Sequence, residues 1–231
     1  AANIGIAMGS GTDVAKETSS MIILDDNFKS IVVGIKEGRN AYSNIRKISY
    51  MLLSCGVAEV LFFLLAIILD MPMPLVAIQL LWLNIVTDGL QDFALSSEKA
   101  ESNIMKEPPR DPKETLFNKD LASEVLISGL AIGIIVFLTW MYLLNKLHMP
   151  IDTARGYIMT LMVFMQNMHV LNCRSEKQST FKVSLKTNPL IIFSILGAIF
   201  LQIIFSEIPY LSKFLQTTSI PIIHMLILFA L

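Results

Sequence analysis

Charged side chains are scarce in this sequence: Asp, Glu, Lys and Arg together make up 16% of its 231 residues, while hydrophobic residues make up 54%. An ordinary soluble domain carries roughly 25% charged residues. This deficit excludes a water-soluble fold of this length. The formal net charge is −1 and no basic domain stands out, so nucleic acid is excluded as a partner.

Cysteine is also nearly absent. The two cysteines, Cys55 and Cys173, are far apart and have neither metal-binding nor redox spacing, so no disulfide framework is expected. Cys55 lies in an apolar run and is expected to be a small buried hydrophobe, and the thirteen scattered methionines are expected to serve packing. The first residues lack the basic start and apolar core of a signal peptide. Because the chain does not begin with Met and ends within an apolar run, both ends are expected to be fragment boundaries.

Residues 1–28 differ from the rest of the chain. A short apolar run, 3–8, stops at Gly9-Ser10-Gly11, as a buried strand followed by a turn would. Thr12 then stands where a helix N-cap belongs, and a second short apolar run covers 21–24. Strand, helix and strand in so few residues predict the edge of an α/β domain.

The remainder of the chain has the pattern of membrane helices. A basic stretch, 29–49, predicts a cytoplasmic helical stalk, and a spanning helix needs about 20 mostly apolar residues. Six stretches within 50–231 reach or approach that length: 50–69, 75–95, 121–144, 155–172, 189–207 and 219–231. The predicted fold is therefore mainly α, a polytopic helical membrane bundle of six spans preceded by a small α/β remnant.

Lys and Arg are unevenly distributed between the two ends of these spans. Four lie between 36 and 47, five in the 96–120 loop and four in the 173–188 loop, whereas the connections at the other ends hold few. Because basic residues stay on the cytoplasmic side, residues 1–49 and both basic loops are predicted to be cytoplasmic. The protein is expected to be an integral, multi-pass membrane protein with the lipid bilayer as its first partner.

The predicted spans contain acidic residues that a membrane should exclude, since a central carboxylate costs roughly 2.5–3.5 kcal/mol. Glu59 lies near the middle of the first span and Asp88 in the middle of the second. Asn84, Thr87 and Asp88 are spaced i, i+3 and i+4 and so share one face of an α-helix. Neither span contains Lys or Arg to pair with these acids. A bound cation is therefore the simplest neutraliser.

Two further residues are possible ligands, namely Asp92, one turn after Asp88, and Gln166 in the fourth span. Hard cations such as Ca²⁺ take six to eight oxygens, so these side chains alone form an incomplete cage. Simpler interpretations stay open, because Glu59 can be protonated or hydrogen-bonded, and Gln166 and His169 can join helices through hydrogen bonds. Six spans with central acids would also permit a channel or a secondary transporter.

Several motifs, in the right order, resemble those of P-type cation ATPases of the calcium-pump type. Ala2-Asn-Ile-Gly-Ile-Ala-Met-Gly9 and Gly11-Thr-Asp-Val-Ala-Lys-Glu17 resemble the end of that family's phosphorylation domain. Gln79-Leu-Leu-Trp-Leu-Asn-Ile-Val-Thr-Asp-Gly-Leu90 resembles its sixth membrane helix, and Glu107-Pro-Pro-Arg-Asp-Pro112 resembles the loop that follows. The resemblance covers the chain end to end and implies helices five to ten of a ten-helix bundle. A channel has no reason to carry the tail of a phosphorylation domain.

The resemblance implies that the full-length enzyme couples ATP hydrolysis to cation transport, most simply Ca²⁺ export from the cytoplasm across the plasma membrane. It places the phosphorylated Asp and the ATP and Mg²⁺ sites in domains that precede residue 1. The chain alone is therefore expected to be inactive, with the missing N-terminal part of the same protein as its partner.

The positions that match Ca²⁺ ligands in pumps of this type are Glu59, Asn84, Thr87 and Asp88. Two positions depart from the pattern, because Gly56 stands where those pumps have a ligand Asn and Gln166 where they have a ligand Glu. The departures favour a single Ca²⁺ per cycle. They also leave a pump for Mn²⁺, Mg²⁺, Na⁺/K⁺ or H⁺ as an alternative.

Overall fold

The computed structural model describes residues 4–101, 103–106, 108–110, 115–175 and 180–229. Several residues named or counted above lie outside the described residues. They are residues 1–3, which include the start of the first motif, Glu107, Lys113, Lys177, and 230–231 at the end of the sixth predicted span. The chain divides into two compact units, one formed by 1–43 with 100–110 and the other by 44–99 with 111–231. Each unit is described by itself.

The first unit begins with the predicted strand, helix and strand. Strand β1 (Ile6–Met8) pairs in parallel with β2 (Met21–Ile23), and α1 (Asp13–Thr18) connects them. The Thr12 hydroxyl caps α1 by accepting a hydrogen bond from the Ala15 amide at 3.3 Å, which confirms the predicted N-cap. A Cβ on Gly9 would lie 2.9 Å from the Leu24 carbonyl oxygen, so the turn after β1 needs glycine.

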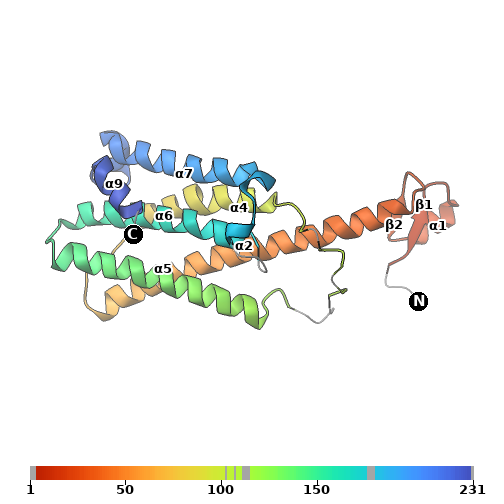
Figure 1. Cartoon of the computed structure of the whole chain (residues 1–231), viewed down its shortest axis with the longest axis horizontal. Helices are drawn as coiled ribbons and strands as arrows, with labels where there is room; N and C mark the ends of the chain where they lie inside the picture. Colours follow the sequence, from red (N-terminus) through yellow and green to blue (C-terminus); the bar gives the residue numbers. More distant parts are fainter. Residues whose placement is uncertain (1–3, 102, 107, 111–114, 176–179, 230–231) are drawn as a thin grey trace. The chain divides into compact units, whose positions relative to one another are not determined.

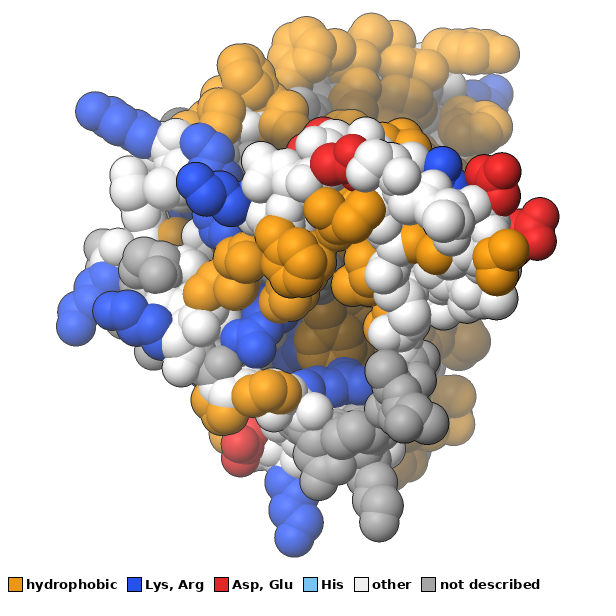
Figure 2. Space-filling model, turned by 90° about the vertical axis from the view of Figure 1, so that its right-hand side faces the viewer, with side chains coloured by type: hydrophobic (Ala, Val, Ile, Leu, Met, Phe, Trp, Pro, Cys, Tyr) orange, Lys and Arg blue, Asp and Glu red, His pale blue; other side chains and the backbone are white. Residues whose placement is uncertain are grey.

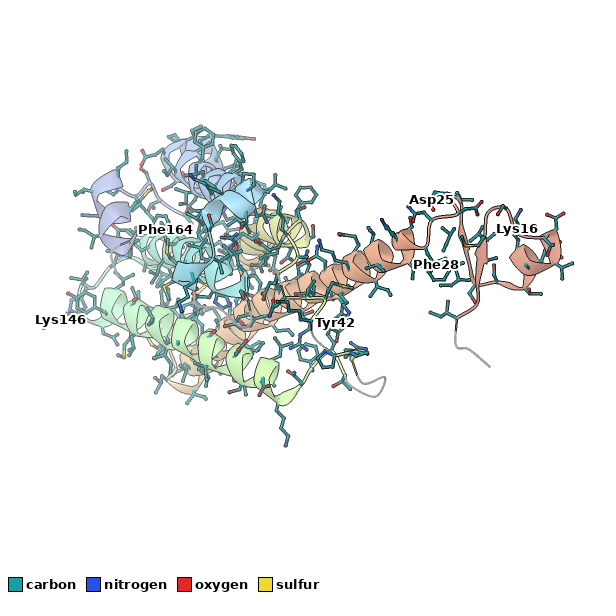
Figure 3. All side chains as sticks on the ribbon, turned by 45° about the vertical axis from the view of Figure 1, so that its right-hand side comes forward. Lys16, Asp25, Phe28, Tyr42, Lys146 and Phe164 are labelled. Carbon is teal, nitrogen blue, oxygen red and sulfur yellow. The ribbon has the colours of Figure 1, made fainter. Side chains whose placement is uncertain are left out.

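The connection after β2 leads into α2 (Lys29–Ile68), whose first part belongs to this unit. Figure 3 shows Asp25 and Phe28 in that connection, and the Asp25 carboxylate accepts a hydrogen bond from the Ser30 hydroxyl at 2.7 Å. Farther along α2, Arg39 donates to the Ile104 carbonyl at 2.8 Å, and the Arg110 guanidinium lies 4.2 Å from the centre of the Tyr42 ring. These two contacts attach the 100–110 segment to α2.

The second unit is a helical bundle. Its other helices are α3 (Ala77–Leu83), η1 (Asn84–Gly89), α4 (Leu90–Ser96), α5 (Lys119–Asn145), α6 (Ile151–Cys173), α7 (Pro189–Glu207), α8 (Pro209–Phe214) and α9 (Ile222–Phe229), with short 3₁₀ turns η2 (Thr180–Lys182) and η3 (Leu185–Thr187). The Asn118 and Asn188 side chains cap α5 and α7. Helix α6 packs against α3, α5, α7 and α9 and is the central helix of the bundle (Figure 1).

Among the described residues, three helices are long and apolar enough to cross a membrane: α2, α5 and α7. They correspond to the predicted spans 50–69, 121–144 and 189–207. Large apolar side chains such as Ile127, Phe193 and Phe200 are exposed on them, and Figure 2 shows hydrophobic side chains on the molecular surface. Lipid is the solvent that suits such a surface.

The other three predicted spans, 75–95, 155–172 and 219–231, remain predictions. The 75–95 stretch is divided among α3, η1 and α4, and α9 has eight described residues. Helix α6 is long enough, but it buries polar side chains in the bundle and is less apolar than a lipid-facing helix.

Helix α5 packs very closely against α2. A Cβ on Gly129 would lie 2.6 Å from Val57 Cγ1, and a Cβ on Gly133 would lie 2.9 Å from the Ala58 carbonyl oxygen. The Tyr50 hydroxyl and the Ser128 hydroxyl also meet at 2.7 Å across this interface. Small residues four apart let the backbones of membrane helices approach, so the two glycines set the distance between α5 and the helix that carries Glu59.

Candidate cation site

A polar layer separates two apolar clusters in the bundle. One cluster includes Phe62, Leu83 and Ile158, and the other includes Met51, Leu95 and Val170. These apolar residues lie on three parts of the chain: α2, the segment from α3 to α4, and α6. In each part, polar side chains stand along the sequence between the residues of one cluster and those of the other. They are Glu59 on α2, Thr87, Asp88 and Gln91 on η1 and α4, and Gln166 and Asn167 on α6.

The centre of this layer is a π-helix. Residues 84–89 form η1, in which backbone hydrogen bonds run from residue i to i+5, and π-helical turns often mark functional sites. Thr87 and Asp88 are buried at 0% and 3% exposure, whereas Asn84 is exposed and donates to the Leu80 carbonyl at 2.9 Å. Asn84 therefore differs in environment from Thr87 and Asp88 in this chain, and its role as a ligand stays a prediction.

Helix α6 faces this segment through two amide side chains, both fully buried. The Thr87 hydroxyl hydrogen-bonds Gln166 Oε1, and Gln91 Nε2 donates to Asn167 Oδ1 at 2.7 Å. Asn167 in turn donates to the Val163 carbonyl at 2.8 Å. Gln166 thus joins α6 to η1 through a hydrogen bond, at the residue that precedes Asp88, and its role as an ion ligand stays a prediction.

Helix α3 is attached at the other end of the π-helix. Trp82 Nε1 donates to Gln202 Oε1 on α7 at 2.9 Å, and Gln202 Nε2 donates to the Thr160 hydroxyl on α6 at 2.9 Å. The π-helix is thus held between an anchor at Trp82 and an anchor at Gln91.

Four buried acceptor oxygens in this layer have no hydrogen-bond partner within the part of the chain that the structure describes. They belong to Glu59 (Oε1), Asp88 (Oδ1), Gln91 (Oε1) and Asp92 (Oδ1). The carboxyl of Asp88 is close enough to Glu59 and Asp92 to be repelled by both. Leaving a buried acceptor unsatisfied costs about 1–3 kcal/mol, so the layer favours a species that brings positive charge.

The structure brings some predicted residues together and leaves others apart. Glu59, Thr87, Asp88, Asp92 and Gln166 belong to the polar layer, although Glu59 and Asp92 are only half-buried. Among the described residues no three or more His, Cys, Asp or Glu side chains form a ready metal site. A cation held here would draw the rest of its oxygens from amide, hydroxyl and carbonyl groups or from water.

Sequence analysis missed two features that shape this site. One is the Gly129 and Gly133 pair, for which the spacing of two glycines four apart in an apolar stretch is a recognisable signal. The other is a buried ion pair between Glu98 and Arg174. No local sequence pattern predicts this pair, because 76 residues separate the partners.

Comparison with known proteins identifies the family of the chain. The family described as "Cation transporting ATPase, C-terminus" matches residues 72–231. The chain is 40% identical over 220 residues to a calcium-transporting ATPase of Bacillus subtilis (95% of this chain, 25% of the relative). It is 35% identical over 233 residues to the human calcium-transporting ATPase type 2C member 1 (100% and 25%), and 34% identical over 228 residues to calcium-transporting ATPase 1 of Bacillus cereus (92% and 26%).

The chain spans about a quarter of the length of these curated relatives. The family match covers more than half of the chain, and the relatives align with nearly all of it. The chain therefore belongs to the cation-transporting ATPase C-terminus family, as the carboxy-terminal region of a P-type cation ATPase of the calcium-pump type.

Proposed function

We propose that the whole protein is an ATP-driven pump that exports Ca²⁺ from the cytoplasm, and that this chain supplies a large part of its ion site. The observation that carries the proposal is the set of four unpartnered buried oxygens on Glu59, Asp88, Gln91 and Asp92. Hydrogen bonds to neutral donors would satisfy such oxygens only in part, whereas a hard divalent cation satisfies several at once.

Each predicted ligand has a role in this proposal. Asp88 is the central charged ligand, because its side chain is buried in the polar layer, whereas those of Glu59 and Asp92 are half-buried. Glu59 supplies the second carboxylate from α2, and Thr87 supplies its hydroxyl or the adjacent carbonyl. Asn84 is exposed in this chain and would complete the coordination from the outer side of η1. Asp92 and Gln166 adjust the charge and the hydrogen bonding around these ligands.

The chemistry of ATP hydrolysis belongs to parts of the protein beyond this chain. The relatives, four times longer, are named calcium-transporting ATPases. The proposal assigns ATP and Mg²⁺ binding and the phosphorylated Asp to those parts, and it assigns membrane-embedded ion binding to the present chain. It places the pump in the plasma membrane. The distribution of Lys and Arg supports the placement of residues 1–49 in the cytoplasm.

The proposal of one Ca²⁺ per cycle is supported by two positions, Gly56 and Gln166. Gly56 offers no side-chain oxygen, and nothing lies within 4 Å of a Cβ built on it. Gln166 offers a neutral oxygen that already accepts a hydrogen bond from Thr87. These features support one Ca²⁺ per cycle, because a second divalent ion would need further oxygens and charge.

The experiment that tests the proposal replaces Asp88 with Asn in the full-length protein. Apparent Ca²⁺ affinity in ATP-dependent ⁴⁵Ca uptake by membrane vesicles should fall at least tenfold, which corresponds to about 1.4 kcal/mol. The matched control is Asp120→Asn, the same chemical change at an exposed position in the first turn of α5. Wild-type Ca²⁺ dependence in the Asp88 variant would contradict the proposed role.

A pump for another cation is the second candidate, and the neutral Gln166 beside Thr87 favours it because a site of low charge suits a monovalent ion. Stimulation of ATP hydrolysis by Ca²⁺, Mn²⁺, Mg²⁺, Na⁺, K⁺ or H⁺ in the same preparation separates these ions. Transport that continues without ATP would instead indicate a channel or a secondary transporter.

A further inference from the structure

A cluster of soft metal-binding side chains lies next to the oxygen layer, within the second apolar cluster. Cys173 Sγ is 3.4 Å from His169 Nε2 and 3.9 Å from Met51 Sδ. All three residues are buried, at 1%, 3% and 0% exposure. The cluster thus combines a thiol, an imidazole and a thioether in an apolar environment.

Helix geometry brings these donors together. His169 and Cys173 are four residues apart on α6 and so lie on one face of that helix. Met51 belongs to α2, where it directly follows Tyr50. The Tyr50 ring contacts the imidazole edge-to-face with 5.1 Å between ring centres and helps to orient it.

The two distances suit a shared metal ion. With bonds of about 2.3 Å to sulfur and about 2.0–2.1 Å to nitrogen, as for Zn²⁺, the printed separations correspond to angles at the metal of roughly 100° between Cys173 and His169 and roughly 115° between Cys173 and Met51. Both angles lie in the range of three- and four-coordinate sites. Without a metal, the same two distances fit hydrogen bonds: the Cys173 thiol donates to Met51 Sδ, and His169 Nε2 would then donate to Cys173 Sγ.

The identity of the donors selects the metal. Thiolate and thioether ligands favour soft ions, above all Cu(I), whereas Ca²⁺ and Mg²⁺ require oxygen. We propose that Cys173, His169 and Met51 form a Cu(I) site that is distinct from the oxygen layer. Binding forms metal bonds to the two sulfurs and to the imidazole nitrogen, releases the thiol proton to the solvent and leaves the metal in its +1 state.

Occupation of this site would connect α2 to α6 close to the ion ligands. Met51 lies about two helical turns from Glu59 on α2, and His169 lies three residues from Gln166 on α6, so the proposed site is close to the polar layer. A metal that joins the two helices would restrict their relative motion and inhibit cation transport. This inhibition rests on the proposed function, whereas the binding itself does not.

The test measures Cu(I) binding to the purified full-length protein under anaerobic conditions, in competition with the chromophoric chelator bicinchoninate. Wild type should bind one equivalent more than Cys173→Ser, and Met51→Leu should weaken that equivalent at least tenfold. Met51→Leu conserves volume and keeps the core packed, so a loss in this variant reports on the thioether rather than on folding. Cys55→Ser is the matched control for a buried thiol and should retain the site.

Equal Cu(I) binding by wild type, Cys173→Ser and Met51→Leu would overturn the proposal. Uptake of ⁴⁵Ca without copper is measured on the same preparations and tests the proposed function separately. If uptake is absent but the Cu(I) equivalent is present, the pump assignment fails and the metal site stands. If uptake is normal but the additional equivalent of Cu(I) is absent, the pump assignment stands and the metal site fails.

Discussion

Arg174 and Glu98 form a buried bidentate ion pair: Arg174 Nη2 lies 2.8 Å from Glu98 Oε1, and Arg174 Nε lies 3.2 Å from Glu98 Oε2. Asn188 donates to Glu98 Oε2 at 2.9 Å, and Asn44 donates to the Glu98 carbonyl at 2.8 Å. Arg174 also donates to the Thr187 hydroxyl at 2.8 Å. The pair therefore joins the end of α4 to α2, α6 and α7, the helices that surround the polar layer.

Breaking this pair should be costly. Glu98→Gln in the full-length protein is expected to destabilise the membrane domain by about 3–5 kcal/mol, because Arg174 would be left as a buried charge without its counter-ion. Thermal unfolding in detergent measures the effect. The double variant Glu98→Met/Arg174→Met should be clearly more stable than the single variant.

The pair between Arg155 and Asp152 is the control, with 3.1 Å between its charged atoms and an exposed Asp152 side chain. Asp152→Asn should change stability by less than about 1 kcal/mol. Equal effects at Glu98 and Asp152 would show that burial of the first pair has no energetic consequence.

The glycine contact between α5 and α2 leads to a second prediction. Gly133→Ala places a methyl group 2.9 Å from the Ala58 carbonyl oxygen, a backbone atom that cannot move aside on its own. Overpacking of this kind typically costs about 1–3 kcal/mol, and it should also reduce Ca²⁺ affinity because α2 carries Glu59. Gly197→Ala on α7 is the control, since its added methyl group meets no atom closer than 4.0 Å.

Ion stoichiometry can be changed if the single-site proposal is correct. Equilibrium ⁴⁵Ca binding, normalised to phosphorylatable sites, should give one ion per wild-type pump. The double variant Gly56→Asn/Gln166→Glu adds two oxygen-bearing groups, one of them at a position with open space around it, and should bind a second ion. Two ions with positive cooperativity in the wild type would refute the proposal.

The six-span topology predicts which loops are accessible from outside. A cysteine introduced at Lys146, the exposed residue labelled in Figure 3 at the end of α5, should react with a membrane-impermeant maleimide in intact cells. A cysteine at the exposed position Lys182 should not react, because its loop is predicted to be cytoplasmic. Labelling at both positions would require a different number of spans.

Local sequence signals predicted local structure well. The Thr12 cap, the two short strands and three membrane-length helices follow from side-chain type and hydropathy over a few residues, and all are present. The polar residues of the layer could also be identified from the sequence, because a carboxylate or amide is rare within an apolar stretch.

Features that depend on distant residues or on backbone register could not be predicted in this way. The partners Glu98 and Arg174 become neighbours only when α4, α6 and α7 pack together. The spacing of Asn84, Thr87 and Asp88 predicts one shared face on a regular α-helix, whereas residues 84–89 form a π-helix. Charge and hydropathy predict a stalk over 29–49 and a separate span over 50–69, whereas the structure contains one continuous helix, α2.

The π-helix also has a consequence for how this segment can vary in length. A turn with i to i+5 hydrogen bonds accommodates one residue more than an α-helical turn, so η1 behaves like a retained single-residue insertion. Deleting one residue from 84–89 would let a regular α-helical turn replace the π-turn, and α3 and α4 would keep nearly the same phase because the π-turn already absorbs the extra residue. Trp82 could then keep its contact with Gln202 while Gln91 keeps its contact with Asn167. A one-residue deletion within the regular turns of α4 before Gln91 or of α3 after Trp82 would instead rotate one anchor by about 100° relative to the other. Loss of a residue should therefore be tolerated within η1 more readily than in the α-helical turns beside it.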